Sequence, residues 1–551
     1  MSASRERKKR AELTAQGISA KQLKAVEEKK RKKKNTLVGI ICAVVAAAIL
    51  LGCLYFLVIR PNMQPRKTVA ATVGEHELSA TQFSYYYYDS VNSFYQQYGS
   101  YLSYLIDTST PIDEQVYDEG TGETWADYFI KSAGESAKQD YAVYDAAKKD
   151  GFKLSAETEQ SVKDSMDALE DDIKANGFKS MKQYLTSVYG KGATEKSYYD
   201  YQILHATAAE YAQKIDGERE YSAEQIKAKY DENPNPYTNV SYRSFYFSSA
   251  DFKEESVVDE AVDYVEEGEE DAAAEAEQAA QEAALAAAEE AAGIMAAKAD
   301  GSEDKFIELA KENAGEANAS YYEDPDATLS AEKAFDSVPT YMVDWLYEDG
   351  RKEGDTTVVS DGGNGYYALM FLGLEDNDYN LVDVRQILFQ PETDEDSDGD
   401  GTPDAISDDA KAKAKADAEA LLAKWQAGDH TEESFAALSD EQTGGTDGGL
   451  YTDIYHGYMV DSFNDWCFDP ARKAGDAEVV ETEYGYHVIY FSGECDNYRD
   501  SMIIADLKEA DYDAWDAELT EGYDAVTNDA GLKFLRTDLV LGSDTAAEAV
   551  E

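Results

Sequence analysis

The chain of 551 residues is 43% hydrophobic and contains 41 tyrosines, which is enough apolar material for several cores and argues against wholesale disorder. Its 112 Asp and Glu residues outnumber its 50 Lys and Arg residues, for a formal net charge of −62. This charge argues against nucleic acid or anionic lipid as a partner of the acidic region, and it favours basic polypeptides or divalent cations.

The N-terminal part of the chain predicts a membrane anchor. Residues 1–35 carry 13 Lys or Arg against four Glu, and residues 36–59 form an apolar run without a charge. A helix of that length crosses a hydrocarbon core of about 30 Å. The positive-inside rule then predicts that residues 1–35 are cytoplasmic and that everything after the span, from Arg60 onward, with a formal charge of −71, lies outside the cell membrane. A cleaved secretory signal and a lipoprotein processed at Cys53, which follows Leu50-Leu51-Gly52, are the alternatives.

Residues 68–217 predict a mainly helical domain. One strand, residues 69–73, comes first, and Phe83, Tyr86 and Phe94 then follow at spacings typical of an amphipathic helix. A short helix after this domain begins at Ser222, with a glutamine three residues later in a capping-box pattern. Two Asn-Pro pairs end it and mark a domain boundary.

Two later segments repeat one another, at residues 240–375 and residues 382–495. The sequence Tyr-Met-Val-Asp occurs at residues 341–344 and again at residues 458–461, and both copies are followed by an Arg-Lys-x-Gly-Asp motif and a strand-like ending. Two units of this length are tandem domains, since a solenoid needs more and shorter repeats. In each, a strand leads through an acidic segment to helices and two closing strands, an order that predicts an α+β fold with a small antiparallel sheet.

Three other segments are simpler. Residues 269–297 are almost all Ala, Glu and Gln and predict either an extended, solvated helix or a partner-binding helix. Residues 496–541 return to helical periodicity and could pack against the N-terminal helical domain, and residues 542–551 predict a disordered tail.

The second repeat resembles the parvulin-type peptidyl-prolyl isomerases, and the chain as a whole resembles the membrane-attached foldases of the PrsA and SurA kind. The motifs that carry the resemblance occur in the family's order: Val384-Arg385-Gln386-Ile387-Leu388, Phe435-Ala436-Ala437-Leu438-Ser439-Asp440, Gly448-Gly449-Leu450, Gly457-Tyr458-Met459 with Phe463, and Tyr484-Gly485-Tyr486-His487-Val488-Ile489.

The resemblance implies a function for each segment. Residues 68–217 would be a chaperone domain like the N-terminal domain of SurA, residues 240–375 a degenerate parvulin-like domain, and residues 382–495 the isomerase. The expected partners are unfolded or partly folded exported proteins with X-Pro segments, and no cofactor is required. A holding chaperone without catalysis is the main rival, and a structural cell-surface or adhesion protein is a third reading.

The same resemblance assigns site residues. Leu450, Met459 and Phe463 would form the apolar socket for proline, His487 matches the second of two facing histidines, and Glu441 stands where the family commonly has Cys or Asp. Gln386 stands in place of the first histidine. Glutamine can donate and accept hydrogen bonds as neutral imidazole does, but it cannot titrate near neutral pH, so the activity is in question.

The first repeat has Ser244 and Tyr367 at the two histidine positions. We expect it to bind or to act as a spacer without catalysis.

An acidic loop in the second repeat predicts a calcium site on the residues alone. Carboxylates alternate with other residues and a glycine occupies the sixth position, as in the start of a calcium-binding loop. The ligands would be Asp396, Asp398, Asp400, Thr402 and Asp404. The twelfth position is Ser407 and not a bidentate glutamate, so we expect weak affinity, about 0.1–1 mM. A solvated acidic loop is the alternative. Elsewhere, Cys467 and Cys495 could form a disulfide or remain two separate thiols.

Overall fold

The computed structural model describes residues 60–253, 270–392 and 406–542, together with residues 44–53 and a few isolated positions before them. The chain divides into two compact units, Met1–Arg219 with Ala510–Glu551, and Glu220–Glu509. A helical unit and two small antiparallel sheets with helices confirm the predicted α+β class.

The predicted membrane span is mostly outside the described residues. Residues 44–53 are helical, while residues 36–43 and 54–59 are not described. Within the part of the chain that is described, no helix is long and apolar enough to cross a bilayer. The span therefore stays a prediction, as does the tail, of which only the first residue is described.

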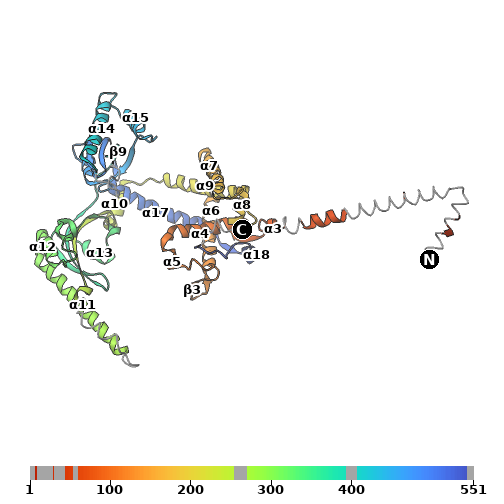
Figure 1. Cartoon of the computed structure of the whole chain (residues 1–551), viewed down its shortest axis with the longest axis horizontal. Helices are drawn as coiled ribbons and strands as arrows, with labels where there is room; N and C mark the ends of the chain where they lie inside the picture. Colours follow the sequence, from red (N-terminus) through yellow and green to blue (C-terminus); the bar gives the residue numbers. More distant parts are fainter. Residues whose placement is uncertain are drawn as a thin grey trace. The chain divides into compact units, whose positions relative to one another are not determined.

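The first unit is a group of helices on a small sheet (Figure 1). The β1 strand pairs antiparallel with β2 and with β13, in the order β13-β1-β2, so the C-terminal segment completes the sheet of the N-terminal segment. The pairing of β1 with β13 and the second strand β2 were not visible in the sequence pattern. The elements are α3 (Arg60–Met63), β1 (Val69–Val73), β2 (His76–Ser79), α4 (Ala80–Tyr98), α5 (Leu102–Leu105), β3 (Val116–Asp118), β4 (Glu123–Thr124), α6 (Trp125–Lys149), α7 (Ala156–Ala175), α8 (Met181–Val188), α9 (Glu195–Gly217), β13 (Ala525–Thr527) and α18 (Asp529–Leu532).

Side-chain caps start the main helices of this unit. Ser79 before α4, Thr124 before α6 and Thr194 before α9 each form a capping box with the third helical residue. Each cap satisfies backbone N–H groups that have no partner within the helix. The aromatic residues at helical spacing, such as Phe83 and Tyr86, are buried in the core of the unit.

The second unit holds α10 (Ala223–Glu232) and the two repeats, and α17 (Tyr498–Thr520) runs from it into the first unit along the chain. The capping box predicted between Ser222 and Gln225 at the start of α10 is confirmed. The first repeat has the sheet order β6-β5-β8-β7 and the second has the order β10-β9-β12-β11. Their elements are β5 (Asn239–Ser248), α11 (Glu270–Ala299), α12 (Glu303–Asn313), β6 (Leu329–Lys333), α13 (Thr340–Leu346), β7 (Thr356–Ser360) and β8 (Gly365–Glu375), then β9 (Asn380–Phe389), α14 (Asp408–Gln426), α15 (Glu432–Thr443), β10 (Leu450–Ile454), α16 (Asp461–Cys467), β11 (Ala477–Thr482) and β12 (Gly485–Asn497).

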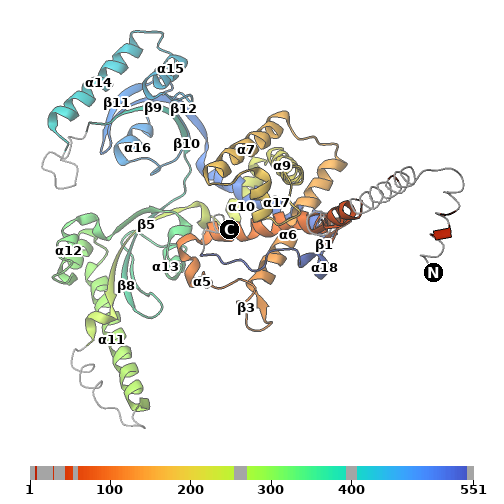
Figure 2. The ribbon, with the colours of Figure 1, turned by 45° about the vertical axis from the view of Figure 1, so that its right-hand side comes forward.

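Each sheet of the second unit buries both faces. In the second repeat, Ile387 and Val488 face α14 and α15, whereas Val384 and Ile489 face α16. Figure 2 shows these helices on the two sides of the strands. Neighbouring residues of a strand point to opposite faces, so each strand serves two cores with alternating side chains.

The alanine-rich helix of the first repeat is not simply solvated. Ala288, Ala292 and Ala296 of α11 are buried against Phe245 and Met370 of the sheet. Alanine allows a helix to approach a sheet closely, and it has the highest helix propensity. The C-terminal half of α11 is therefore a core helix, which corrects the expectation of an extended, solvated one.

The two repeats share a Trp–Arg contact that fixes their correspondence. The guanidinium of Arg351 lies 3.8 Å from the ring centroid of Trp345, and that of Arg472 lies 3.8 Å from the ring centroid of Trp466. In both pairs the arginine Nε donates to the tryptophan carbonyl oxygen. These tryptophans are therefore equivalent positions.

This equivalence corrects the alignment suggested by the Tyr-Met-Val-Asp match. Counting back from the tryptophans, residues 341–344 correspond to residues 462–465, not to residues 458–461. The shift is four residues, and the match of letters joins residues 341–344 of the helix α13 to residues 458–461, of which 458–460 precede the start of α16 at Asp461. Met342, buried in the first repeat, thus occupies the place of Phe463.

Candidate active site

Gln386 and His487 come from neighbouring strands of the second repeat and lie on the same face of its sheet. Gln386 of β9 is directly opposite Ile489 of β12, and His487 lies two residues away from Ile489. Side chains two residues apart in a strand share a face, and directly opposed residues do too. The register thereby brings the two polar side chains together on the α16 face, with His487 Nδ1 2.9 Å from Gln386 Oε1.

These two residues belong to a chain of four hydrogen-bonded groups. The Oγ1 of Thr482, at the end of β11, lies 2.9 Å from His487 Nε2, and Gln386 Nε2 donates to the hydroxyl of Tyr451 at 3.3 Å. Because Gln386 Oε1 can only accept, His487 Nδ1 carries the proton and Nε2 accepts from Thr482. The hydrogen bonds therefore run in one direction: Thr482 donates to His487, His487 donates to Gln386, and Gln386 donates to Tyr451.

His487 is a buried, neutral imidazole. Its side chain is packed edge to face against Phe463, with ring centroids 5.3 Å apart, and only 8% of the residue is exposed. Burial lowers the pKa of His487, because removal from water disfavours the charged form. The site is thus arranged for hydrogen bonding without a formal charge at neutral pH.

The expected socket residues divide between the two faces. Phe463 is fully buried in the cluster below the site, and Met459 packs against the same cluster while remaining partly exposed. Leu450 does not join them, since it pairs with Arg385, whose side chain reaches Glu432 of α15 on the other face.

Tyr451 is the β10 residue that faces the site. It lies opposite Val384, which packs on the α16 side, and its hydroxyl contacts Gln386. Sequence reasoning missed both Tyr451 and Thr482. The strand alternation after Gly449 could have indicated Tyr451, but the register between β9 and β10 was needed to choose it over Leu450.

Glu441 lies apart from this hydrogen-bonded chain. Its side chain is 68% exposed near the end of α15, and its carboxylate pairs with Lys424 of α14 at 3.0 Å. An exposed ion pair of this kind contributes little to stability. The described contacts give Glu441 no part in the chain that runs from Thr482 to Tyr451.

The corresponding face of the first repeat is a cluster of tyrosines. Tyr367, at the position of His487, has its ring centroid 4.7 Å from that of Tyr246 and 5.9 Å from that of Tyr341. Tyr246 also donates to Asp361 at 2.7 Å. Ser244, at the position of Gln386, lies opposite Leu369. No imidazole stands on this face among the described residues.

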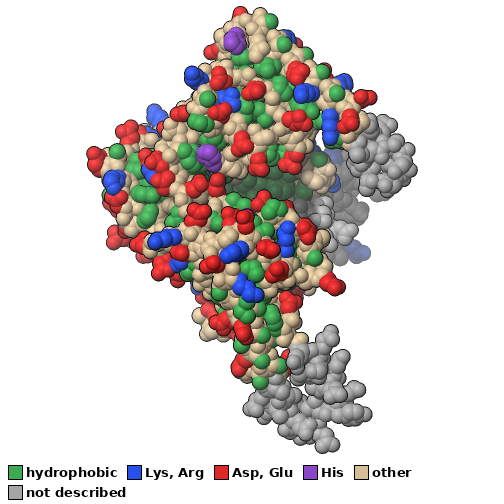
Figure 3. All heavy atoms as spheres, turned by 90° about the vertical axis from the view of Figure 1, so that its left-hand side faces the viewer, with side chains coloured by type: hydrophobic (Ala, Val, Ile, Leu, Met, Phe, Trp, Pro, Cys, Tyr) green, Lys and Arg blue, Asp and Glu red, His purple; other side chains and the backbone are tan. Residues whose placement is uncertain are grey.

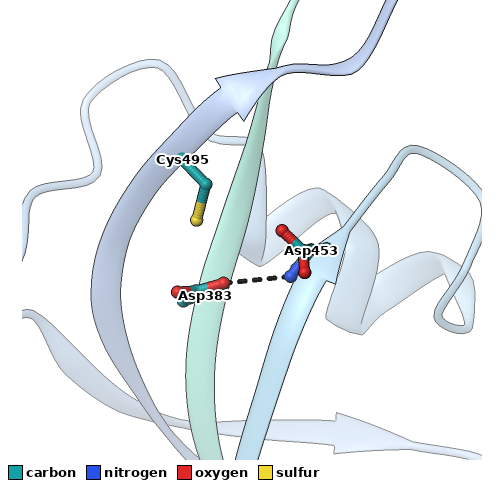
Figure 4. Close-up of side chains that lie close together, drawn as sticks. All are labelled: Asp383, Asp453 and Cys495. Atoms are coloured by element: carbon teal, nitrogen blue, oxygen red, sulfur yellow. Dashed lines mark hydrogen bonds between the residues drawn. The ribbon is translucent and has the colours of Figure 1, made fainter. Parts of the chain in front are cut away.

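One other group of the second repeat has metal-ligating atoms close together. Asp383 of β9, Asp453 of β10 and Cys495 of β12 each offer a ligand atom, and these atoms lie within 4.8 Å of one another (Figure 4). Asp383 is already engaged, since its Oδ1 accepts from the Asp453 amide at 2.9 Å. Burial raises the pKa of Cys495 to about 12, with further contributions from the two carboxylates, so the thiol is protonated.

Two further expectations concern residues 393–405 and the cysteines. The predicted calcium ligands Asp396, Asp398, Asp400, Thr402 and Asp404 lie outside the described residues. Cys467 and Cys495 are separate thiols in this structure.

Comparison with known proteins identifies one domain. Residues 368–494 match the family described as the PPIC-type PPIASE domain. No curated protein matches the chain. Among solved structures, the peptidylprolyl isomerase PrsA from Bacillus anthracis is 18% identical with a TM-score of 0.16, and the match covers 29% of this chain and 61% of that one. PrsA from Bacillus cereus is 17% identical with a TM-score of 0.17, and the match covers 32% of this chain and 59% of that one.

Proposed function

We propose, on the premise that residues 368–494 match the PPIC-type PPIASE domain, that the chain is an extracytoplasmic, membrane-anchored foldase. Its second repeat catalyses cis-trans isomerisation of X-Pro bonds in exported proteins, and its helical unit holds unfolded clients. The observation that carries the proposal is the partly buried chain of hydrogen bonds through His487 and Gln386 inside this domain.

The reaction needs a site that stabilises a twisted imide. An X-Pro bond rotates slowly, with a barrier of about 18–20 kcal/mol, because the C–N bond has partial double-bond character. Rotation breaks this conjugation and leaves a more basic nitrogen with less charge on the carbonyl oxygen. An apolar surface for the proline ring and a hydrogen-bond donor near the imide both favour that state over the planar ground state.

The second repeat can supply both features. Met459, which is partly exposed, offers apolar surface, and the buried ring of Phe463 supports it from below. Because the donors run from Thr482 through His487 and Gln386, the Tyr451 hydroxyl accepts from Gln386 and keeps its own hydrogen for a ligand. Hydrogen bonds in such a chain polarise one another, which strengthens the terminal donor. Tyr451 is 39% exposed and accessible to a substrate. No step requires a proton to be exchanged, so glutamine can replace an imidazole.

A prolyl-peptide isomerisation assay on the full chain tests this proposal. Tyr451→Phe removes only the hydroxyl, and we expect it to lower kcat/KM about tenfold, which corresponds to about 1.4 kcal/mol. Met459→Ala should also lower the rate, while suppression of client aggregation should survive. If the wild-type chain has no isomerase activity but still suppresses aggregation, the non-enzymatic holding chaperone is the correct function. The loss of a titratable side chain at Gln386 is the observation that favours this second candidate.

The cellular location is a proposal based on the sequence. Residues 1–35 would be cytoplasmic, residues 36–59 would span the membrane once, and the rest would be outside. Protease added to intact cells should then remove both repeats and leave an N-terminal epitope protected. Protection of the repeats would reverse the orientation, and release of the chain by signal cleavage would remove the anchor.

We also propose that the loop between β9 and α14 binds calcium weakly through Asp396, Asp398, Asp400, Thr402 and Asp404. The proposal rests on the spacing of these residues. The isomerase itself would require no cofactor.

A further inference from the structure

A cavity of about 430 Å³ lies within the helical unit, far in sequence from the isomerase site. Its walls come from α4, α6 and α9, which pack against one another and are grouped together in Figure 1. The volume falls in the range of small-ligand sites, about 300–1,000 Å³. Besides tyrosines, three titratable side chains line it: Asp89 of α4, Asp140 of α6 and His205 of α9.

The charge of this cavity is negative. Lysine and arginine are absent from the described residues that line it. Asp140 is 13% exposed, and its counter-charge is His205, whose Nδ1 lies 3.1 Å from both carboxylate oxygens. The hydrogen bond with Asp140 raises the pKa of His205, although burial opposes the rise. Even with His205 protonated, one carboxylate remains uncompensated.

Asp89 is that second carboxylate. Its contact in the cavity is the Tyr201 hydroxyl, a neutral donor. Burial raises the pKa of Asp89 and the charge of Asp140 adds to the rise, while the hydrogen bond from Tyr201 and the charge of His205 oppose it. A carboxylate has about four acceptor positions, so one hydroxyl leaves most of them unused. Asp89 is partly buried and shares its cationic neighbour, His205, with Asp140, so it loses hydration without a full counter-charge, a cost that a bound cation would offset.

The other walls suit an organic cation on an aliphatic stem. The rings of Tyr86 and Tyr201 meet edge to face at 4.9 Å, and Phe94 and Tyr128 lie 6.2 Å apart along the same cavity. Aromatic faces attract guanidinium and ammonium groups and also cover their methylene chains. A hydrated metal ion would gain little from such walls.

We propose that this cavity binds an arginine or lysine side chain of a client polypeptide, with its cationic head between Asp89 and Asp140. Arginine is favoured, because its planar fork of donors can reach two carboxylates and stack on tyrosine at once. The acidic exterior of the chain concentrates basic segments near the cavity; Figure 3 shows Asp and Glu side chains spread over one face of the molecule. That the bound side chain belongs to a client polypeptide rests on the proposed foldase function. Binding of an arginine or lysine side chain to the cavity does not rest on it.

Ligand-observed NMR titration of the full chain with blocked tripeptides tests the proposal. The probes are acetyl-Gly-Arg-Gly-amide, its lysine analogue and its citrulline analogue, which has nearly the shape of arginine without the charge. We expect the arginine peptide to bind more tightly than the lysine peptide, and the citrulline peptide to bind at least tenfold more weakly than the arginine peptide. Equal binding of arginine and citrulline peptides would overturn the proposal.

The chain offers a matched control on the same helix. Asp145 of α6 also contacts a histidine and a tyrosine, His76 and Tyr523, each at 2.7 Å, but it does not line the cavity. Asp140→Asn should weaken the arginine peptide at least tenfold, and Asp145→Asn should leave its affinity unchanged. Asp89→Asn is the second variant if Asp140→Asn lowers the melting temperature. Unchanged affinity for the arginine peptide in both cavity variants would refute the site. His487→Ala should bind the arginine peptide with wild-type affinity, so the cavity is tested separately from the isomerase.

Discussion

The two repeats have the same frame and different chemistry on one face. In both, a buried arginine of the first strand pairs with a glutamate at the start of a helix, Arg243 with Glu303 at 2.7 Å and Arg385 with Glu432 at 2.9 Å. Both also retain the Trp–Arg contact. At the positions that Gln386 and His487 hold in one repeat, the other has Ser244 and Tyr367.

This difference indicates which contacts build the fold and which belong to the site. The arginine–glutamate pairs occur in both repeats, and so does a core between the sheet and two helices, α11 and α12 in the first repeat and α14 and α15 in the second. These contacts set the sheet register in both repeats. The α16 face of the second repeat and the α13 face of the first share that register but need not share side chains. A site can therefore be lost or changed there without loss of the fold.

The largest expected effect is on isomerase activity, which should depend on the second repeat and not on the first. His487→Ala in the full chain should lower kcat/KM at least tenfold, about 1.4 kcal/mol or more, because it breaks the hydrogen-bonded chain at its centre. Tyr367→Phe, at the equivalent position of the first repeat, should leave the rate unchanged. The comparison would fail if both variants reduced activity alike, or if His487→Ala retained full activity with a normal melting curve.

A smaller effect tests the shared frame. Arg351→Met and Arg472→Met keep much of the stem but remove the contact with tryptophan, and each should destabilise its own repeat by about 1 kcal/mol. Urea unfolding of the full chain followed by tryptophan fluorescence measures both. Loss in only one variant would show that Trp345 and Trp466 are not equivalent.

Gln386→His should raise isomerase activity about threefold, or roughly 0.7 kcal/mol, if two imidazoles position the terminal donor better than an amide does. The paired change in the first repeat, Ser244→His with Tyr367→His, should create no activity, since Tyr246 and Asp361 still occupy that face. Activity in the doubly substituted first repeat, measured in a His487→Ala background, would show that the two faces differ by these positions alone.

Calcium should stabilise the second repeat, and the expected gain in its free energy of unfolding is smaller still. At a calcium concentration equal to its Kd, the second repeat gains about 0.4 kcal/mol, seen as a slight rise of its melting temperature. Asp398→Asn with Asp400→Asn should abolish the rise. A wild-type melting curve that calcium does not move would leave the solvated acidic loop as the correct reading.

The smallest effect concerns pH. Burial lowers the pKa of His487 below its usual value near 6.5, so the folded site stays neutral while the unfolded chain gains a proton. Its contribution to stability is therefore present above about pH 6.5 and is lost as pH falls towards the lowered pKa. Isomerase rates should change less than about twofold between pH 8 and pH 6.5. A steep decline within that interval would mean that His487 titrates there.

The sequence predicted the α+β repeats because the strand-like endings at residues 365–371 and 485–491 are local signals, as is the capping box at Ser222 before α10. It also predicted Gln386 and His487 as a pair through the family's motif order. It failed where pairing across strands decides the outcome: the choice of Tyr451 over Leu450 depends on a register that no local pattern encodes. The four-residue error in aligning the repeats has another cause: the letters Tyr-Met-Val-Asp recur at positions that are not equivalent, and the Trp–Arg contacts show which residues correspond.

The pairing of β1 with β13 has a consequence for the order of folding. Ala71 lies opposite Thr527, so the sheet of the first unit joins residues from nearly opposite ends of the chain. Each repeat is continuous in sequence and can fold before the rest of the chain has been synthesised, whereas the first unit must wait for the last part of the chain. A chain interrupted shortly after Asn497 would keep both sheets of the repeats and leave β1 with an unpaired edge. The helical unit is thus the last part of the molecule to be completed, and β13 determines when its sheet closes.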